Sequence, residues 1–520
     1  MKRLTLLLCL FITVFPYLSG QAKGLRQIDR NDLRAYMNFL ASDELQGREA
    51  GTVANNIASV FIESNLRRMG IEPPYGNGSY LQHFDLTSTR IVKTSLVVSD
   101  AGGARIFSAD SVVTLMGRYG ISETSGELVF AGYGYDDTRT DNSDLGDIDI
   151  KDKIVLVMTR NPAIADSSGV NAGYVFDEKA EAIKLLSLIM REPKAVLMVY
   201  DPKNSFSDPW ESGLADYFLD TERTSLLEDQ SEASLPGIYF ITGMTADILL
   251  SPAGTSLKQF QEMIGSMKIP CSTSIPGIRV SIDSPPETRE YTASNVIGMI
   301  EGSDPVLKNE CIVYTAHFDH VGMASDSTIF NGADDNASGT AGLLEIAEAF
   351  RSLRKRPLRS VVFAWMNAEE KGLLGSEYYA RHPVIPTDRT ILNINLDMIG
   401  RSITPADTGD FFGTPLDVTG PNEIQVYSGN IKNEFRKQML RSAGKAGLSV
   451  LEMGEQMEFG SSDHQSFAEK GVPWLFFHTG IHADLHQPED DTSKIDFEKM
   501  EKAAKLAFLT GYRIANSGRQ

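Results

Sequence analysis

Acidic residues and histidines follow three apolar, strand-like runs in the C-terminal half of the sequence. Each run ends in a short polar motif, and two more motifs lie between and after them. The residues concerned are His317, Asp319 and His320 after run 312–316, Asp334 and Asp335 in loop 331–339, Glu369 and Glu370 after run 360–366, Asp397 after run 391–396, and His482 and His486 near the end. Imidazole and carboxylate groups together suit zinc or a related first-row divalent ion. The sequence therefore predicts a metal site.

Each motif alone has an ordinary structural explanation. A His-X-Asp triplet is typical of an exposed turn, Glu369-Glu370 suits the start of a helix, and Asp334-Asp335-Asn336 suits a helix N-cap. The combination is different, because several carboxylates brought together at strand ends repel one another unless cations neutralise them. The joint pattern favours a metal-dependent catalytic centre.

The elements that must position these residues alternate along the C-terminal part. After residue 295, the pattern predicts strands at 296–300, 312–316, 360–366 and 391–396, and helices at 338–351 and 373–381. Such alternation predicts an α/β fold with a doubly wound, mostly parallel sheet and helices on both faces. Loops at the carboxyl ends of such strands converge on a crevice, and the candidate ligands stand in these loops.

The preceding part of the chain has a different pattern. Residues 28–86 are helical in pattern, with a long helix predicted at 53–69 and ended by Gly70. From 108 to 285, short β-rich runs alternate with turns rich in Gly, Asp and Pro. This part is expected to form a separate lobe.

Composition and charge exclude several classes of protein. The chain has 520 residues, of which 42% are hydrophobic, a formal charge of −20 and 3 cysteines. It is therefore neither a disulfide-dense miniprotein nor a disordered acidic tail. It contains no run of five or more basic residues, so binding to nucleic acid or to an anionic membrane is not expected. No stretch after the N-terminal region is apolar enough for a membrane helix, so the mature protein is expected to be soluble.

Residues 1–22 have the three-part pattern of a secretory signal peptide. They contain Lys2-Arg3, an apolar run at 4–15 and the small residues Ser19-Gly20. Cleavage of this segment predicts a protein that works in a periplasmic or extracellular space, and it would remove Cys9. Cys271 and Cys311 would then be two free thiols or one disulfide.

Taken together, the motifs resemble the co-catalytic dizinc exopeptidase family of bacterial leucyl aminopeptidases and glutamate carboxypeptidase. The resemblance rests on the order and spacing of His317-Phe318-Asp319, 332–339, 367–370, 395–398 and His486, and it covers residues 25–105 and 290–517. Segments 130–134 and 149–157 resemble the protease-associated domain often inserted in these enzymes. The implied organisation is a signal peptide at 1–22, the N-terminal part of the catalytic domain at 25–107, an inserted β-rich protease-associated domain at 108–285 and the main catalytic domain at 290–517.

The resemblance implies two zinc ions and a role for each motif, with another first-row ion left open. The implied ligands are His317 and Asp397 for one ion, Glu370 and His486 for the other, and Asp335 for both. The implied catalytic residues are Glu369 and Asp319. Glu369 would take a proton from the metal-bridging water that attacks the scissile carbonyl and return it to the leaving amine, and Asp319 would orient the His317 imidazole. For His320, His478 and His482, both contact with the substrate and a structural role stay open. Leu485 occupies the position at which some family members carry a tyrosine that polarises the substrate carbonyl.

The implied activity is that of a secreted zinc-dependent exopeptidase, an aminopeptidase that removes N-terminal residues from peptides. A dizinc carboxypeptidase or dipeptidase-like hydrolase stays open, and it would need a cation such as Arg401 to hold the substrate carboxylate. A single-zinc glutaminyl cyclase is a further alternative by fold, but the complete set of two-metal ligands disfavours it. A non-catalytic binding ectodomain would lack ligands that are all present here. Peptides are the expected substrates, while the side-chain preference and the oligomeric state are not indicated by the sequence.

Overall fold

The structure is a computed structural model that describes residues 21–518 apart from 92, 101, 108–110, 117–122, 135, 138–141, 147, 160–177, 203–208, 211–221, 230–234, 268–271, 412–413 and 455–461. The described residues form two compact units. The first unit consists of the residues up to Leu86, Ser225–Glu228 and the residues from Tyr291 onward. The second unit consists of Thr87–Thr224 and Asp229–Glu290. Residues 1–20 of the predicted signal peptide lie outside the described residues, as does Cys271.

A nine-stranded mixed sheet organises the first unit, in the order β10-β1-β13-β15-β14-β16-β21-β19-β20. Its strands are β1 (Leu81–Ile91), β10 (Arg223–Leu226), β13 (Pro286–Ile300), β14 (Cys311–His317), β15 (Ser360–Met366), β16 (Thr390–Leu396), β19 (Glu423–Gly429), β20 (Ser449–Glu452) and β21 (Trp474–His478). The four middle strands β15, β14, β16 and β21 run parallel to one another. The flanking strands β13 and β19 are antiparallel to them. The carboxyl ends of the four parallel strands therefore meet at one edge of the sheet.

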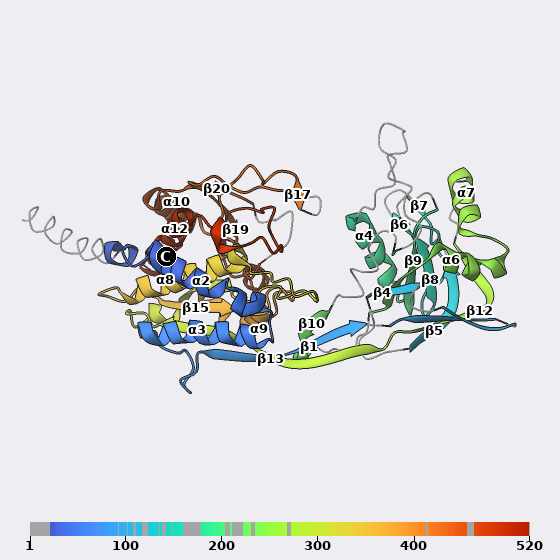
Figure 1. Cartoon of the computed structure of the whole chain (residues 1–520), viewed down its shortest axis with the longest axis horizontal. Helices are drawn as coiled ribbons and strands as arrows, with labels where there is room; N and C mark the ends of the chain where they lie inside the picture. Colours follow the sequence, from blue (N-terminus) through green and yellow to red (C-terminus); the bar gives the residue numbers. More distant parts are fainter. Residues whose placement is uncertain are drawn as a thin grey trace, which may run out of the picture. The chain divides into compact units, whose positions relative to one another are not determined.

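Helices cover both faces of this sheet. They are α2 (Arg30–Leu40), α3 (Val53–Met69), α8 (Gly339–Arg351), α10 (Asn433–Ala446) and α12 (Phe497–Ala515) on one face, and α9 (Leu374–Arg381) and α11 (His464–Glu469) on the other. On the first face Tyr314 packs against Phe350 of α8, and on the second Tyr379 of α9 packs against Phe467 of α11. In Figure 1 the blue α2 lies beside α8 and the red α12, although these helices come from distant parts of the chain. The α/β fold with helices on both faces is confirmed, with a parallel centre and antiparallel flanks.

No helix in the part of the chain that the structure describes is long and apolar enough to cross a membrane.

Local sequence explains where the elements of the N-terminal part begin and end. The helix predicted at 53–69 is α3, in which Thr52 caps the first turn by accepting a hydrogen bond from the N–H of Asn55. Gly70 ends the helix in the left-handed conformation, at φ 69°. The helical pattern predicted up to residue 86 is wrong for its last part, because β1 begins at Leu81. There Phe84 is buried between two exposed neighbours, which is the two-residue period of a strand.

The second unit is built on a mixed eight-stranded sheet, in the order β3-β2-β12-β5-β8-β9-β11-β4. Its strands are β2 (Ser95–Asp100), β3 (Gly103–Phe107), β4 (Val112–Met116), β5 (Glu123–Phe130), β8 (Ile154–Met158), β9 (Ala195–Val199), β11 (Gly237–Ile241) and β12 (Thr273–Asp283). The strands β5, β8, β9 and β11 are parallel, and their alternate side chains enter two apolar clusters.

The second unit also contains helices α4 (Glu178–Ile189), α6 (Gly243–Leu250) and α7 (Leu257–Met267) and the short strands β6 (Asp136–Asp137) and β7 (Asn142–Ser143). Two further short strands, β17 (Asp410–Phe411) and β18 (Thr414–Pro415), belong to the first unit. The protease-associated character of the second unit stays a prediction.

Candidate metal centre

The predicted ligands converge at the carboxyl edge of the parallel strands. His317 is the last residue of β14, Asp397 directly follows β16, and Glu370 lies in the turn after β15. Asp335 lies in the irregular turn Ala333–Ser338 before α8, and His486 lies in the loop after β21. All five residues belong to groups whose ligand atoms lie within 4.8 Å of one another. The strand order therefore brings together residues that are far apart in the sequence.

Two sets of ligand atoms share Asp335: His317, Asp335 and Asp397, and His320, Asp335, Glu370 and His486. A third set, without Asp335, is His317, Glu369 and Glu370. His317 Nε2 lies 3.3 Å from Asp335 Oδ1 and 3.2 Å from Asp397 Oδ1. His486 Nε2 lies 3.0 Å from Asp335 Oδ2 and 3.2 Å from Glu370 Oε2. The two oxygens of Asp335 thus face different sets, as a bridging carboxylate requires.

These separations fit divalent metal ions. Zinc binds imidazole nitrogen and carboxylate oxygen at about 2.0–2.1 Å in tetrahedral geometry, so two ligand atoms on one ion lie about 3.3 Å apart. The four distances given above run from 3.0 to 3.3 Å. The His317 side chain is 1% exposed, whereas that of His486 is 40% exposed. Each set therefore fits one ion, and the His486 side of the centre is open to solvent.

Asp319 binds the turn that carries the two glutamates. Its Oδ1 accepts a hydrogen bond from the N–H of Glu369 at 3.2 Å, and its Oδ2 accepts one from the N–H of Glu370 at 3.3 Å. The carboxylate lies 3.9 Å from His317 Nδ1, while the backbone oxygen of Asp319 lies 3.3 Å from the same nitrogen. Asp319 therefore connects the His317 loop to the glutamate turn.

The carboxylate of Glu369 lies beside the first set without being one of its closest groups. Its side chain is 11% exposed, and its Oε2 lies 4.0 Å from His317 Nε2. The oxygens of Asp335 and Asp397 are closer to this nitrogen, at 3.3 and 3.2 Å. Glu369 is thus near the centre, where it also belongs to the possible ligand set with His317 and Glu370.

His320, which the sequence left open, belongs to the second set. It is fully buried, and its Nδ1 lies 2.8 Å from Glu370 Oε1 and 3.6 Å from Asp335 Oδ2. An imidazole in this position fixes the orientation of the Glu370 carboxylate.

His478 and His482, whose roles the sequence also left open, contact residues at or beside the predicted ligands. His478 Nδ1 lies 2.9 Å from the backbone oxygen of Asp397. His482 is fully buried, and its Nε2 lies 3.5 Å from an oxygen of Asp334. Both side chains are therefore part of the support of the centre.

Burial and nearby charges shift the pKa values of the centre strongly. Burial acts to raise the pKa of Asp335, but hydrogen bonds with His317 and His486 outweigh it and hold that pKa well below its ordinary value. Burial acts to lower the pKa of His486, but Glu370 and Asp335 outweigh it and raise the value to about 11. Burial raises the pKa of Glu369 well above its ordinary value, and Glu370 adds to the effect. The carboxylates thus attract positive charge, which divalent cations would supply.

Arg401, the candidate clamp for a substrate carboxylate, is already paired inside the protein. Its side chain is 3% exposed, its Nη2 donates to Asp484 at 2.6 Å, and its Nη1 lies 3.6 Å from Asp490. Asp490 in turn accepts hydrogen bonds from the backbone N–H groups of Asp334 and Asp335 at 3.0 and 3.1 Å. Arg401 therefore supports the loop of the shared carboxylate and is not available to a substrate.

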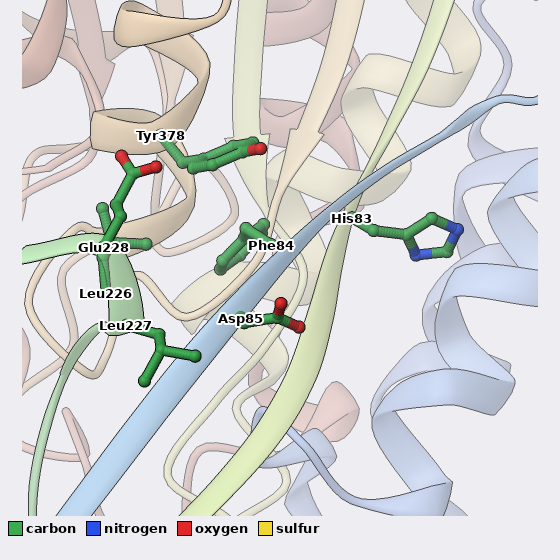
Figure 2. Close-up of a pocket in the computed structure, with 7 residues that line it drawn as sticks. All are labelled: His83, Phe84, Asp85, Leu226, Leu227, Glu228 and Tyr378. Atoms are coloured by element: carbon green, nitrogen blue, oxygen red, sulfur yellow. The ribbon is translucent and has the colours of Figure 1, made fainter.

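A pocket of about 310 Å³ in the first unit shares no residue with the metal centre. It is lined by His83, Phe84, Asp85, Leu226, Leu227, Glu228 and Tyr378 (Figure 2). Asp85 accepts a hydrogen bond from Thr292 at 2.7 Å, and Glu228 pairs with Arg381 at 3.1 Å. Figure 2 shows His83 pointing away from Glu228. Because both carboxylates already have protein partners, the metal centre is the stronger candidate for the functional site.

Known proteins share the part of the sequence that carries this centre. The model described as peptidase family M28 matches residues 295–510, which include all five predicted ligands. Aminopeptidase YwaD of Bacillus subtilis (strain 168) is 31% identical over 231 residues, which cover 42% of this chain and 44% of the relative. A probable leucine aminopeptidase of Trichophyton verrucosum (strain HKI 0517) is 29% identical over 217 residues, which cover 40% of this chain and 55% of the relative. The chain spans about half the length of these curated relatives.

A solved structure has the same fold over a longer stretch. The aminopeptidase from Aneurinibacillus sp. strain AM-1 matches with a TM-score of 0.56 and 22% sequence identity, over 96% of this chain and 97% of that chain. At this level of identity the likeness shows the fold alone. The family whose model this chain matches, over residues 295–510, is peptidase family M28.

Proposed function

We propose that this protein is a secreted or periplasmic zinc-dependent aminopeptidase that removes N-terminal residues from peptides. The observation that carries the proposal is the pair of ligand sets that share Asp335. The names of the relatives, which are aminopeptidases, support the reaction. The signal-like pattern of residues 1–22 supports export.

Each ligand set holds one zinc ion in this proposal. The residues that would hold them are His317 and Asp397 on one side, Glu370 and His486 on the other, and Asp335 between them. Bound zinc ions would polarise the scissile carbonyl and lower the pKa of water at the centre. The side chain of His486 is exposed to solvent, so a peptide can reach the centre from that side.

Glu369 acts as the general base in this proposal. Its carboxylate lies beside His317, and its backbone N–H is held by Asp319. From there it takes a proton from the attacking water and returns it to the leaving amine.

One observation disfavours recognition of the carboxyl end of a peptide. The four carboxylates of the centre, on Asp335, Glu369, Glu370 and Asp397, would be balanced by two divalent ions, so their charge does not select a peptide end. Arg401, which a carboxypeptidase would need as a clamp, is paired with Asp484 instead.

Metal content and a peptide panel test the proposal. We expect about two zinc ions per chain, the number that a co-catalytic site requires, and chelator-sensitive cleavage only of peptides with a free amino end. Cleavage of N-acylated peptides from the carboxyl end would instead indicate a carboxypeptidase. A protein that binds no metal and stays inactive after zinc is added back would refute the enzymatic function. The mass of the exported protein tests the removal of the N-terminal segment.

A further inference from the structure

The guanidinium of Arg48 is buried among loops of the metal centre. Arg48 lies between α2 and α3, outside the residues that the family model matches. It is 1% exposed, and its side chain donates hydrogen bonds to four backbone oxygens. The acceptors are those of Leu40, of Phe318 at 2.9 Å, of Asn331 at 2.7 Å and of Gly332 at 3.0 Å. A single side chain thus donates to four backbone carbonyls, of which that of Gly332 also accepts a hydrogen bond from the N–H of Ala337.

Three of these carbonyls lie next to His317 or in the loop of Asp335, which are two of the three ligands of the first set. Phe318 directly follows His317, and Asn331 and Gly332 begin the loop of Asp335. One planar group therefore connects the His317 loop to the Asp335 loop. The ligand atoms of these two loops lie 3.3 Å apart.

The neighbours of Arg48 make similar connections. The backbone oxygen of Arg48 accepts hydrogen bonds from the N–H of His320 at 3.4 Å and from the side chain of Asn55 at 3.0 Å. Asn55 also exchanges two side-chain hydrogen bonds with Asn367, at 3.1 and 2.9 Å, at the start of the glutamate turn. Gly47 has φ 70°, and a side chain there would meet a backbone oxygen of the loop after His320 at 2.2 Å. Segment 47–55 therefore contacts both ends of the connection between β14 and the Asp335 turn, and the start of the turn after β15.

We propose that Arg48 is a positioning residue that sets the metal affinity of the centre by holding the His317 and Asp335 loops at ligand distance. This role rests on the proposed metal centre. The carboxylates of the centre repel one another, so loops without a connection tend to separate when no cation is bound. Arginine suits the connection because its planar group offers five donors in fixed directions, whereas lysine offers three donors on a flexible stem.

The substitution Arg48→Lys tests this role, because it keeps the charge and removes the planar fork. We expect the variant to fold and to bind zinc about 10- to 100-fold more weakly than the wild type, the range typical for loss of a group that orients metal ligands. The matched control is Arg359→Lys. Arg359 is also buried, at 5% exposed, and it pairs with Glu310 at 2.7 Å and donates to the backbone oxygen of Ser517 at 2.5 Å. This control should lose thermal stability and keep the zinc affinity of the wild type.

Affinity is measured on the metal-depleted full-length protein by competition with a chromophoric chelator. The visible absorption spectrum of the cobalt-loaded protein reports the ligand geometry, and we expect it to change in Arg48→Lys and not in Arg359→Lys. Wild-type zinc affinity in Arg48→Lys, or an equal loss in both variants, would overturn the role of Arg48. If Arg48→Lys does not fold, Arg48→Gln, which keeps two amide donors, takes its place, and unchanged affinity there overturns the same role. A wild-type protein that binds no metal would overturn the proposed function itself, which is a different result.

Discussion

Replacement of Glu369 by glutamine separates metal binding from catalysis. Glu369→Gln keeps the size and shape of the side chain and removes one negative charge. Glu369 lies 4.0 Å from His317 Nε2, while Asp335 and Asp397 lie 3.3 and 3.2 Å from it, so the first ligand set stays complete. We therefore expect the variant to contain as much zinc as the wild type.

The size of the expected loss follows from the role of Glu369. A positioned general base contributes about 10²- to 10⁴-fold to the rate. This factor corresponds to about 2.7–5.4 kcal/mol of activation free energy. We expect kcat to fall by this factor and KM to change little, because the groups that contact the ground-state substrate are unchanged.

The same substitution should stabilise the metal-free protein. Burial raises the pKa of Glu369 in the folded state, and Glu370 and Asp397 add to the effect. A carboxyl group whose folded pKa lies above its unfolded value of about 4.3 destabilises the fold increasingly as the pH rises from the lower value to the higher one. Glutamine does not titrate. Metal-free Glu369→Gln should therefore be more stable than the metal-free wild type at pH 8, with a smaller difference at pH 5.

Three measurements check these expectations: zinc content by atomic absorption, steady-state hydrolysis of an aminoacyl substrate, and thermal unfolding of chelator-treated protein at both pH values. Glu370→Gln is the matched control, because it removes the adjacent charge from a residue of the second ligand set. The control should lose zinc, whereas Glu369→Gln should not. Full activity in Glu369→Gln would refute the role of general base, and loss of zinc would indicate that Glu369 is a ligand with His317 and Glu370.

Three further predictions concern the ligands and a buried thiol. His486→Ala should lower the zinc content from about two ions to one per chain, because His486 belongs to one ligand set alone; an unchanged content by atomic absorption would contradict this assignment. Zinc binding should release protons, because Glu370 and Asp335 outweigh burial and raise the pKa of His486 to about 11, so that zinc must displace its proton. Calorimetry in buffers of different ionisation enthalpy counts these protons, and an affinity that does not rise between pH 6 and pH 8 would contradict the prediction. Cys311 is a free cysteine whose pKa burial raises to about 12, so iodoacetamide should modify it only after unfolding, as mass spectrometry of the folded and unfolded protein would show.

The ligand residues were predictable from the sequence because local pattern carries both their type and their position. His317 and Asp397 end or follow strands whose apolar runs mark the edge of a parallel sheet, so the sequence places them together without knowledge of any contact. Arg48 was not predictable. Its partners are backbone carbonyls, of which one lies 270 positions away, and every residue has a carbonyl. The same holds for Asp490, whose carboxylate binds the N–H of Asp335 across 155 positions.

The antiparallel flanks of the sheet also escaped prediction. Alternating strands and helices indicate the parallel centre, because parallel strands need crossover connections. The pairings of β13 with β15 and of β19 with β21 depend on which edge each strand reaches after folding. The start of β1 was missed for a local reason, because its buried positions include the polar residues Gln82, Thr87 and Ser88, so few apolar residues mark the strand.

The short segment Ser225–Glu228 affects how the two units can be made and separated. It lies within the sequence of the second unit but belongs to the first, where Leu226 is buried in one cluster with Phe84 and Leu374. The polypeptide therefore passes between the units four times, at 86/87, 224/225, 228/229 and 290/291. Deletion of 87–290 as one block would also remove Leu226 and uncover the apolar side chains beneath it. During biosynthesis, the first unit can close its core only after residues from both sides of the second unit have left the ribosome, so all residues of the second unit emerge before those of the first are complete.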